Sequence, residues 1–279
     1  MKIIDTHVHF WNYQAESKDF SWVSNEMAIL KKDYLPDDLP LVGELLETFS
    51  SYKCVAVQAR QSMEETLFLL KLAEDNPAIA GVVGWINWLD PEVGKTYTDF
   101  RKYKKLKGFR HVIQDEKKGF MQNSTFRHSI GKIAGRYTYD LLVKPPQIQE
   151  AIELVEEFPH QLFVLDHLAK PNIKNQDFSA WAEDIRKLKS FENLYCKLSG
   201  MVTEAHWHNW NESDFSYVMD VAVETFGPKR LMYGSDWPVC LLASDYKGVY
   251  DIVSNYLDKH PDLDKADIFN NNAVRFYNL

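Results

Sequence analysis

Short apolar runs, many of them rich in β-branched residues, recur along the chain and alternate with longer segments of helical periodicity. Each run is bounded by turn residues, which is typical of a short strand inside an α/β protein. The runs cover residues 2–10, 53–60, 79–87, 106–113, 139–145, 161–168, 194–200 and 230–238. The pattern therefore predicts eight β-strands.

Between these runs, apolar residues repeat every three to four positions, as on one face of a helix. Residues 62–77 begin with the capping-box pattern Ser62-x-x-Glu65 and stop before Pro77. Further segments with this periodicity cover residues 145–159, 178–191 and 213–228. Strands that alternate with helices predict an α/β fold with a parallel sheet.

The length of the chain selects among parallel-sheet folds. No Gly/Ser-rich linker or low-complexity segment divides the 279 residues, so we expect one domain over residues 1–279. A closed (β/α)8 TIM barrel of about 250 residues fits best. A doubly wound sheet is the alternative, but eight parallel strands without a Gly-rich first turn disfavour it.

Charge and cysteine content narrow the partners and the compartment. The 32 Lys and Arg residues against 40 Asp and Glu residues give a net charge of -8, which argues against nucleic acid. Cys54, Cys196 and Cys240 are odd in number and widely spaced, as in a reduced cytoplasm. No apolar stretch reaches the roughly 18 residues of a membrane span, and no signal peptide precedes the first strand. We expect a cytoplasmic protein with no membrane partner; the oligomeric state stays open.

If the fold is a barrel, its function lies where the strands end, because the loops at that face carry the site. Seven predicted strands end in polar or aromatic residues, whereas the fifth ends in Lys144 and has no histidine. These residues are His7 and His9, Gln58 and Arg60, Trp85 and Asn87, Arg110 and His111, Asp166 and His167, Lys197 and Ser199, and Ser235 and Asp236.

Two pairs among them have a predictable geometry. His7 and His9 are one residue apart on a strand, so they point the same way with Cα atoms roughly 6.5 to 7 Å apart. Their imidazoles can converge on a metal ion, a water molecule or a substrate carbonyl. Arg110 and His111 are adjacent and point to opposite faces, so only one enters the barrel. We favour Arg110 as the substrate contact.

Two histidines on the first strand, a histidine after the sixth and an aspartate after the eighth resemble the amidohydrolase superfamily. The resemblance runs from DTHVHF through GFRHV, LDHLAKP and KLSGMVTEA to YGSDWPV. It is strongest for the lactonase group, which includes L-fuconolactonases, L-rhamnonolactonases and 2-pyrone-4,6-dicarboxylate lactonase. Ala169 stands where that group commonly has glycine. The resemblance implies a TIM-barrel hydrolase that opens the ester ring of a sugar lactone.

The resemblance also indicates what the site lacks. Binuclear members bridge two metals with a residue of the fourth strand and take a histidine from the fifth, and this chain offers neither. His7, His9 and Asp236 could hold a single divalent metal such as zinc. Since the lactonase group includes members that work without a divalent ion, we expect no required cofactor, at most one ion, and hydrolysis that persists in the apoprotein.

Lactone opening needs a base for the attacking water and donors for the oxyanion. We expect Asp236 to be the base, with His7, His9 and His167 orienting the water and stabilising the oxyanion; which histidine does which stays open. Arg60, Trp85, Arg110 and His208 are the expected substrate contacts.

The substrate class follows from the aromatic and cationic residues near strand ends. A dicarboxylate lactone needs several converging guanidiniums, and only Arg60 and Arg110 stand at strand ends. Trp11, Trp22, Trp85, Trp88, Trp207, Trp210 and Trp237 fall in or near those ends. An aromatic-lined mouth with few cations favours a neutral L-fucono- or L-rhamnono-type aldonolactone. The alternatives are a metal-dependent decarboxylase of the same superfamily and a non-catalytic carbohydrate-binding barrel.

Overall fold

Eight parallel strands form the centre of the computed structural model, which describes residues 1–39 and 49–279. The strands are Lys2–Val8 (β1), Ser51–Val57 (β2), Ile79–Gly84 (β3), Leu106–His111 (β4), Thr138–Leu141 (β5), Phe163–Leu165 (β6), Leu194–Leu198 (β7) and Leu231–Tyr233 (β8). Each strand pairs with the next in chain order, and Val8 closes the ring by a parallel bridge to Trp237. The predicted TIM barrel is confirmed, and its sequential closure excludes the doubly wound sheet.

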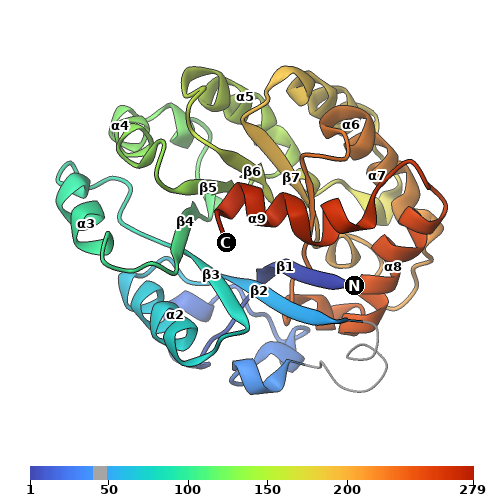
Figure 1. The fold of residues 1–279 in the computed structure, drawn as a ribbon, viewed down its shortest axis with the longest axis horizontal. Coiled ribbons are helices and arrows are strands. Elements are labelled where there is room, and N and C mark those ends of the chain that lie inside the picture. Colours follow the sequence, from blue (N-terminus) through green and yellow to red (C-terminus); the bar gives the residue numbers. More distant parts are fainter. Residues whose placement is uncertain (40–48) are drawn as a thin grey trace.

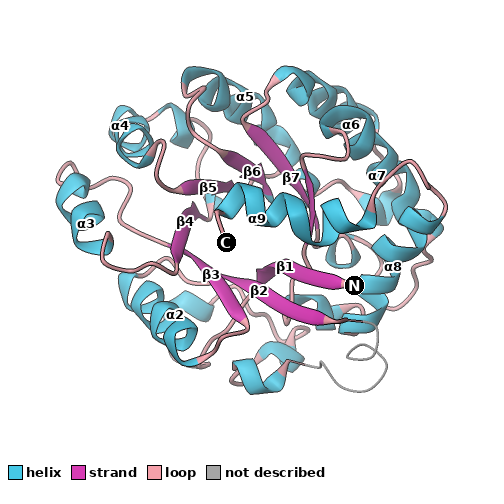
Figure 2. Ribbon diagram, viewed as in Figure 1, coloured by secondary structure: helices cyan, strands magenta, loops and turns pink. Residues whose placement is uncertain are grey.

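Helices cover the outside of the ring of strands (Figure 1, Figure 2). They are Met63–Asp75 (α2), Val93–Phe100 (α3), Ser124–Ile133 (α4), Ile148–Glu157 (α5), Ser179–Arg186 (α6), Ser213–Phe226 (α7), Tyr246–Asp258 (α8) and Asn272–Tyr277 (α9). The four segments predicted from periodicity correspond to α2, α5, α6 and α7. None of the helices in the described part of the chain has the length and hydropathy of a membrane span.

The start of α2 departs from the predicted capping box. Ser62 Oγ accepts a hydrogen bond from the Glu65 amide at 3.0 Å, as an N-cap should. The Glu65 carboxylate, however, does not cap the helix. It accepts hydrogen bonds from the Ala59 and Arg60 amides and from Arg60 Nε. The buried glutamate therefore holds the loop after β2, and with it the side chain of Arg60.

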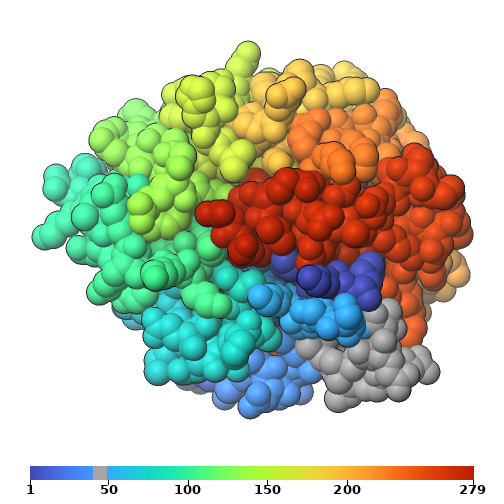
Figure 3. Space-filling model, viewed as in Figure 1, coloured from blue at the N-terminus to red at the C-terminus, as the bar shows by residue number. Residues whose placement is uncertain are grey.

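The interior of the barrel is apolar at its lower end, the end opposite the carboxyl ends of the strands. Ile4, Val55, Val83 and Val164 come from strands around the ring and form one buried cluster. Phe276 of α9 packs into the same cluster, because α9 lies across this end of the barrel (Figure 1). Figure 3 shows the C-terminal segment filling the centre of that face beside the start of β1.

Helix α9 also supplies a polar contact to the barrel interior. Tyr277 Oη donates a hydrogen bond at 2.9 Å to Asp140 Oδ2, which lies on β5 above the apolar cluster. Both side chains are buried. Helix α9 therefore closes this end of the barrel. The opposite end, where the carboxyl ends of the strands lie, is left for a cavity.

Candidate active site

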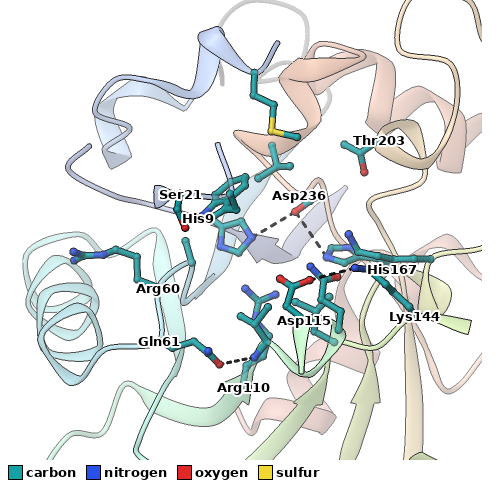
Figure 4. A pocket seen from close by; sticks show the side chains of 18 of the residues that line it. His9, Ser21, Arg60, Gln61, Arg110, Asp115, Lys144, His167, Thr203 and Asp236 are labelled. Atoms are coloured by element: carbon teal, nitrogen blue, oxygen red, sulfur yellow. Dashed lines mark hydrogen bonds and ion pairs between the residues drawn. The ribbon is translucent and has the colours of Figure 1, made fainter. Parts of the chain in front are cut away.

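A cavity of about 720 Å³ opens at the carboxyl ends of the strands. Its lining comes from the loops after every strand except β3, and from residues 18–27 of the long segment after β1. Figure 4 shows side chains from these separate loops pointing into the same space. The location is the one that the barrel fold predicts for a catalytic site.

The structure brings together the four residues predicted to form the centre of the site. Asp236 Oδ1 lies 3.5 Å from His9 Nε2, 3.8 Å from His7 Nε2 and 3.9 Å from His167 Nε2. All four side chains are buried. One carboxylate oxygen therefore faces three imidazole nitrogens, and a single small ligand between them could contact every group; Figure 4 shows Asp236 between two of the rings, those of His9 and His167.

A change in strand register turns the β1 histidines inward. Ile4 belongs to the apolar cluster inside the barrel, so strict alternation would turn His7 outward. The pairing of β1 with β2 shifts between Asp5 and Val8, and His7 and His9 both face the centre. Their ring centroids lie 4.9 Å apart. The closing bridge to β8 fixes the strand end, since the His9 amide donates to Trp237 O at 2.7 Å.

The backbone of the two other central residues is in the left-handed region. Asp236 has φ 60°, and His167 begins a run that extends to Lys170 with φ between 53° and 56°. Such angles cost residues other than glycine roughly 1–2 kcal/mol each, so the surrounding contacts must impose them. Ala169 has φ 56°, an angle that glycine adopts more readily than alanine. Backbone strain of this kind concentrates at functional sites.

Beneath His7 lies a group of fully buried charges, which we call the floor: Arg110, Asp140, Asp166 and Lys197. Lys197 Nζ is 2.5 Å from Asp140 Oδ2 and 3.0 Å from Asp166 Oδ1. Arg110 Nη1 donates to Asp166 Oδ2 at 3.1 Å, and its Nη2 donates to the carbonyl of Gln58. Asp166, Lys197 and Arg110 stood among the polar strand ends, whereas Asp140 gave no sequence signal.

The floor holds the His7 ring from both sides. Its Nδ1 lies 3.4 Å from Asp166 Oδ1 and 3.2 Å from Lys197 Nζ, and its Nε2 lies 3.1 Å from Arg110 Nη1. Both nitrogens face a cation that can only donate, and a neutral imidazole accepts at one of them. With its proton on Nδ1, beside the Asp166 carboxylate, the ring accepts at Nε2 from Arg110. The lone pair of His7 therefore faces the centre of the site.

His9 and Asp236 leave room for a cation between them. His9 Nδ1 contacts the carbonyl of Val57 at 2.8 Å, so this nitrogen carries the proton and Nε2 carries the lone pair. That lone pair faces the Asp236 carboxylate at 3.5 Å, and two acceptors face each other unfavourably unless a cation or a water lies between. His7, His9 and Asp236 each offer a ligand atom within 4.8 Å of the others. This donor set fits a single zinc ion.

The electrostatics of the centre give neutral His7 and His167 imidazoles and an ionised Asp236 carboxylate at neutral pH. Burial lowers the pKa of His167 to about 4 and holds that of His7 well below its usual value. Burial would raise the pKa of Asp236, but the His167, His9 and His7 rings more than offset it, so this pKa lies below its usual value. An added proton therefore rests on an imidazole rather than on the carboxylate.

The predicted substrate contacts divide into two groups. Arg60 and Arg110 line the cavity. Trp85 does not: its indole donates to His111 Nδ1 at 3.0 Å, and the two rings stack outside the barrel interior. His208 is exposed in the loop after β7 and also lies outside the lining. We therefore do not retain Trp85 and His208 as substrate contacts.

The prediction of an aromatic-lined mouth is wrong for most of the tryptophans. Among the described residues only Trp22 and Trp207 line the cavity. Trp11, Trp88 and Trp237 are core side chains with at most 1% of their surface exposed. Large aromatic residues near strand ends also fill the core between the barrel and its surroundings, and these three tryptophans are used in that way.

The cavity also contains more charge than the strand ends suggested. Lys144 forms an ion pair with Asp115 at 3.2 Å, and Lys170 forms one with Glu204 at 3.2 Å. We call these two pairs the rim. All four residues line the cavity. Lys144 was the predicted end of the fifth strand, whereas Asp115, Lys170 and Glu204 lie beyond the strand ends, where strand-end reasoning could not place them.

The fold and the site together define a class, a TIM-barrel hydrolase whose histidines and aspartate converge at the carboxyl ends of the strands. The chain belongs to the amidohydrolase family: the family model described as Amidohydrolase matches residues 4–279. The superfamily membership predicted from the motifs is thereby confirmed.

Curated relatives and a solved structure agree with this family. The chain is 36% identical to an L-fucono-1,5-lactonase of Burkholderia multivorans, over 99% of this chain and 96% of the relative. It is 31% identical to an L-fucono-1,5-lactonase of Burkholderia ambifaria, over 99% and 95%. A crystal structure of an amidohydrolase from Burkholderia multivorans with bound zinc matches with a TM-score of 0.92 and 36% identity, covering 100% of both chains.

Proposed function

We propose that this protein hydrolyses a sugar lactone, with L-fucono-1,5-lactone as the first candidate, and releases the open aldonic acid. The observation that carries the proposal is the Asp236 carboxylate held among three buried imidazoles at the bottom of a polar cavity. Relatives of known activity that match nearly the whole chain are L-fucono-1,5-lactonases, which supports the choice of substrate.

In the proposed reaction, Asp236 and the neutral imidazoles hold a water molecule and accept its proton as it attacks the lactone carbonyl. His167 Nε2 lies 3.9 Å from Asp236 Oδ1, so a water molecule between them can contact both groups, and the proton that it loses then returns to the leaving alkoxide. Donors of the site, including the guanidinium of Arg110, stabilise the negative charge on the carbonyl oxygen. The floor keeps these groups in place before substrate arrives.

A divalent metal ion fits the same centre. His7, His9 and Asp236 would hold it, and an ion bound there would act as a Lewis acid toward water or the carbonyl. We propose that the ion is dispensable, because Asp236, the neutral imidazoles and the fixed cation of Arg110 already supply a base and an electrophile.

The charge balance of the cavity supports a neutral substrate. Each rim lysine is paired with a carboxylate, and Arg60 is paired with Glu65. A carboxylate-bearing lactone would have to break such a pair, whereas a hydroxyl group can donate to the carboxylate and accept from the cation. The paired charges, rather than aromatic side chains, therefore favour a neutral aldonolactone as the substrate.

A lactone panel tests the proposal. Purified enzyme is mixed with L-fucono-, L-rhamnono- and D-sugar aldonolactones and with 2-pyrone-4,6-dicarboxylate, and acid release is followed with a pH indicator. We expect the highest kcat/KM for an L-fucono- or L-rhamnono-type lactone. Absence of turnover above the spontaneous rate for every lactone would refute the proposal and favour a binding barrel.

The same assay separates lactonase from decarboxylase chemistry. Enzyme treated with a chelator and freed of metal, as checked by elemental analysis, should retain its lactonase activity. Activity that disappears with the chelator and returns with zinc, or two metal ions per chain, would contradict the proposed dispensable single site. Release of carbon dioxide from aromatic acids by the zinc-loaded enzyme would favour the decarboxylase.

A further inference from the structure

Arg110 lies at the point where a metal ion would have to bind His7. We propose that the Arg110 guanidinium competes with a divalent metal ion for His7 Nε2 and thereby sets how tightly the site holds the metal. The inference concerns metal affinity and does not depend on which lactone the enzyme hydrolyses.

The competition follows from the single lone pair of the His7 ring. Arg110 Nη1 lies 3.1 Å from His7 Nε2, and the same nitrogen lies 3.8 Å from Asp236 Oδ1. The nitrogen that faces the candidate metal ligands is therefore the one that already accepts the arginine hydrogen bond. A metal ion and Arg110 cannot both use this lone pair, so metal binding must displace the guanidinium.

The charges of the centre and floor favour the same conclusion. Asp140, Asp166 and Asp236 carry three negative charges, and Arg110 and Lys197 carry two positive charges, all of them buried. The net charge of these five groups is -1, and a divalent ion would overcompensate it. Without Arg110 the net charge is -2, which a divalent ion would neutralise. Like charges a few ångströms apart in such an interior repel strongly.

Arg110 is also able to move. Its Nη2 donates to the carbonyl of Gln58 and its Nη1 to Asp166, but its Nε–H is buried with no hydrogen-bond acceptor among the described residues. An unsatisfied buried donor makes the present position of the guanidinium less favourable than full pairing would. Arg110 lines the cavity, so space for the displaced side chain lies directly above.

The test compares zinc affinity in two matched variants. Metal-free wild type, Arg110→Met and Arg60→Met are titrated with zinc in competition with a chromophoric chelator. Arg60 lines the same cavity but pairs with Glu65 and contacts no ring nitrogen of the centre. Removing a charge this close to the ion should tighten zinc binding by about 10- to 100-fold in Arg110→Met. Arg60→Met should change it less than about threefold, since its charge is partly exposed and screened.

Two further measurements keep the inference testable if Arg110→Met folds poorly. Arg110→Lys keeps the charge but cannot reproduce the planar contact, so zinc affinity should fall between wild type and Arg110→Met. In the wild type, the NMR signal of the Arg110 side chain should shift in step with zinc binding. Unchanged or weaker zinc binding in Arg110→Met, equal tightening in Arg60→Met, or an Arg110 signal insensitive to zinc would overturn the inference.

Discussion

The floor and the rim of the cavity are both built from ion pairs, yet they differ in burial and in connection. In the floor, Lys197 and Asp166 have none of their side-chain surface exposed, and each contacts several charged partners. In the rim, Lys144 and Asp115 expose 48% and 59% of their side chains and contact only each other among the ion pairs of the described residues. The same chemical groups therefore have different roles.

Burial determines these roles. Water cannot replace the lost partner of a buried charge, so the ion pairs of the floor hold the His7 ring in position. An exposed pair is screened and is worth at most about 1 kcal/mol, so the rim contributes little stability. The rim instead sets the charge that a substrate meets on entering.

The largest effect should come from the carboxylate above the floor. Asp236→Asn keeps the volume but cannot accept a proton, and loss of a general base typically lowers kcat by about 10² to 10⁴-fold, or roughly 3 to 5.5 kcal/mol. We expect KM to change little, which steady-state kinetics on the best lactone will show. Asp115→Asn at the rim is the control and should keep most of the activity. More than about a third of wild-type kcat in Asp236→Asn would move the base to a histidine.

A slightly smaller effect, on stability, is expected from breaking the floor itself. Lys197→Met leaves Asp140 and Asp166 buried without their shared cation, which should lower the free energy of unfolding by about 3–5 kcal/mol. Urea denaturation measures this, with Lys170→Met at the rim as the matched control. A loss below about 1 kcal/mol would mean that the floor is no more coupled than the rim.

Asp5 sharpens the comparison because it is buried without a cation. It accepts hydrogen bonds from the Ser235 and His7 amides and from Tyr246, and burial raises its pKa to about 6, from 3.8. In Asp166, by contrast, Lys197, His7 and Arg110 more than offset burial and hold the pKa well below its usual value. The hydrogen bonds of Asp5 do not fully offset the free-energy cost of burying its ionised carboxylate.

The raised pKa of Asp5 predicts the direction in which Asp5→Asn changes the stability of the protein. The folded protein binds the Asp5 proton more tightly than the unfolded chain does, so this group favours folding at low pH and its contribution is lost as the pH rises from about 4 to 6. Asp5→Asn should therefore stabilise the protein at pH 7, by at most about 3 kcal/mol, and flatten the stability profile in that window. Thermal unfolding between pH 4 and 7 tests this; a destabilised variant at pH 7 would show that the carboxylate is held ionised.

The smallest effect is expected at the rim. Glu204→Gln leaves Lys170 unpaired and should change the free energy of unfolding by less than about 1 kcal/mol. The freed ammonium should lower KM for a lactone that carries a carboxylate by about two- to fivefold, with no gain for the neutral lactone. Equal changes for both substrates would show that the pair does not act on substrate charge.

The periodicity of the chain predicted the barrel and its eight strands, and the resemblance to the amidohydrolase superfamily then singled out His7, His9, His167 and Asp236 at the strand ends. Periodicity could not predict the register shift in β1, because that depends on pairing with β2, about fifty residues further along the chain. Simple alternation from Ile4 would have placed His7 outside.

Other features were beyond sequence reasoning for different physical reasons. Asp140 became part of the floor only through partners on β7 and α9, far away in sequence. The rim lysines lie in loops, whose paths follow from no periodic pattern. The sequence could not tell which tryptophans near strand ends are packed, as Trp88 and Trp237 are, because sequence position does not distinguish a packed ring from an accessible one.

The contact between Tyr277 and Asp140 can form only late in synthesis, because the two residues lie far apart in the chain. On a ribosome that adds about 5–20 residues per second, the strands that carry Asp140, Asp166 and Lys197 emerge seconds before α9 exists. Until α9 is made, the apolar cluster at this end of the barrel is uncovered, and Asp140 lacks the hydrogen bond from Tyr277. The floor of the nascent chain is therefore completed from the side opposite to the cavity, by a segment that is synthesised after all four of its residues.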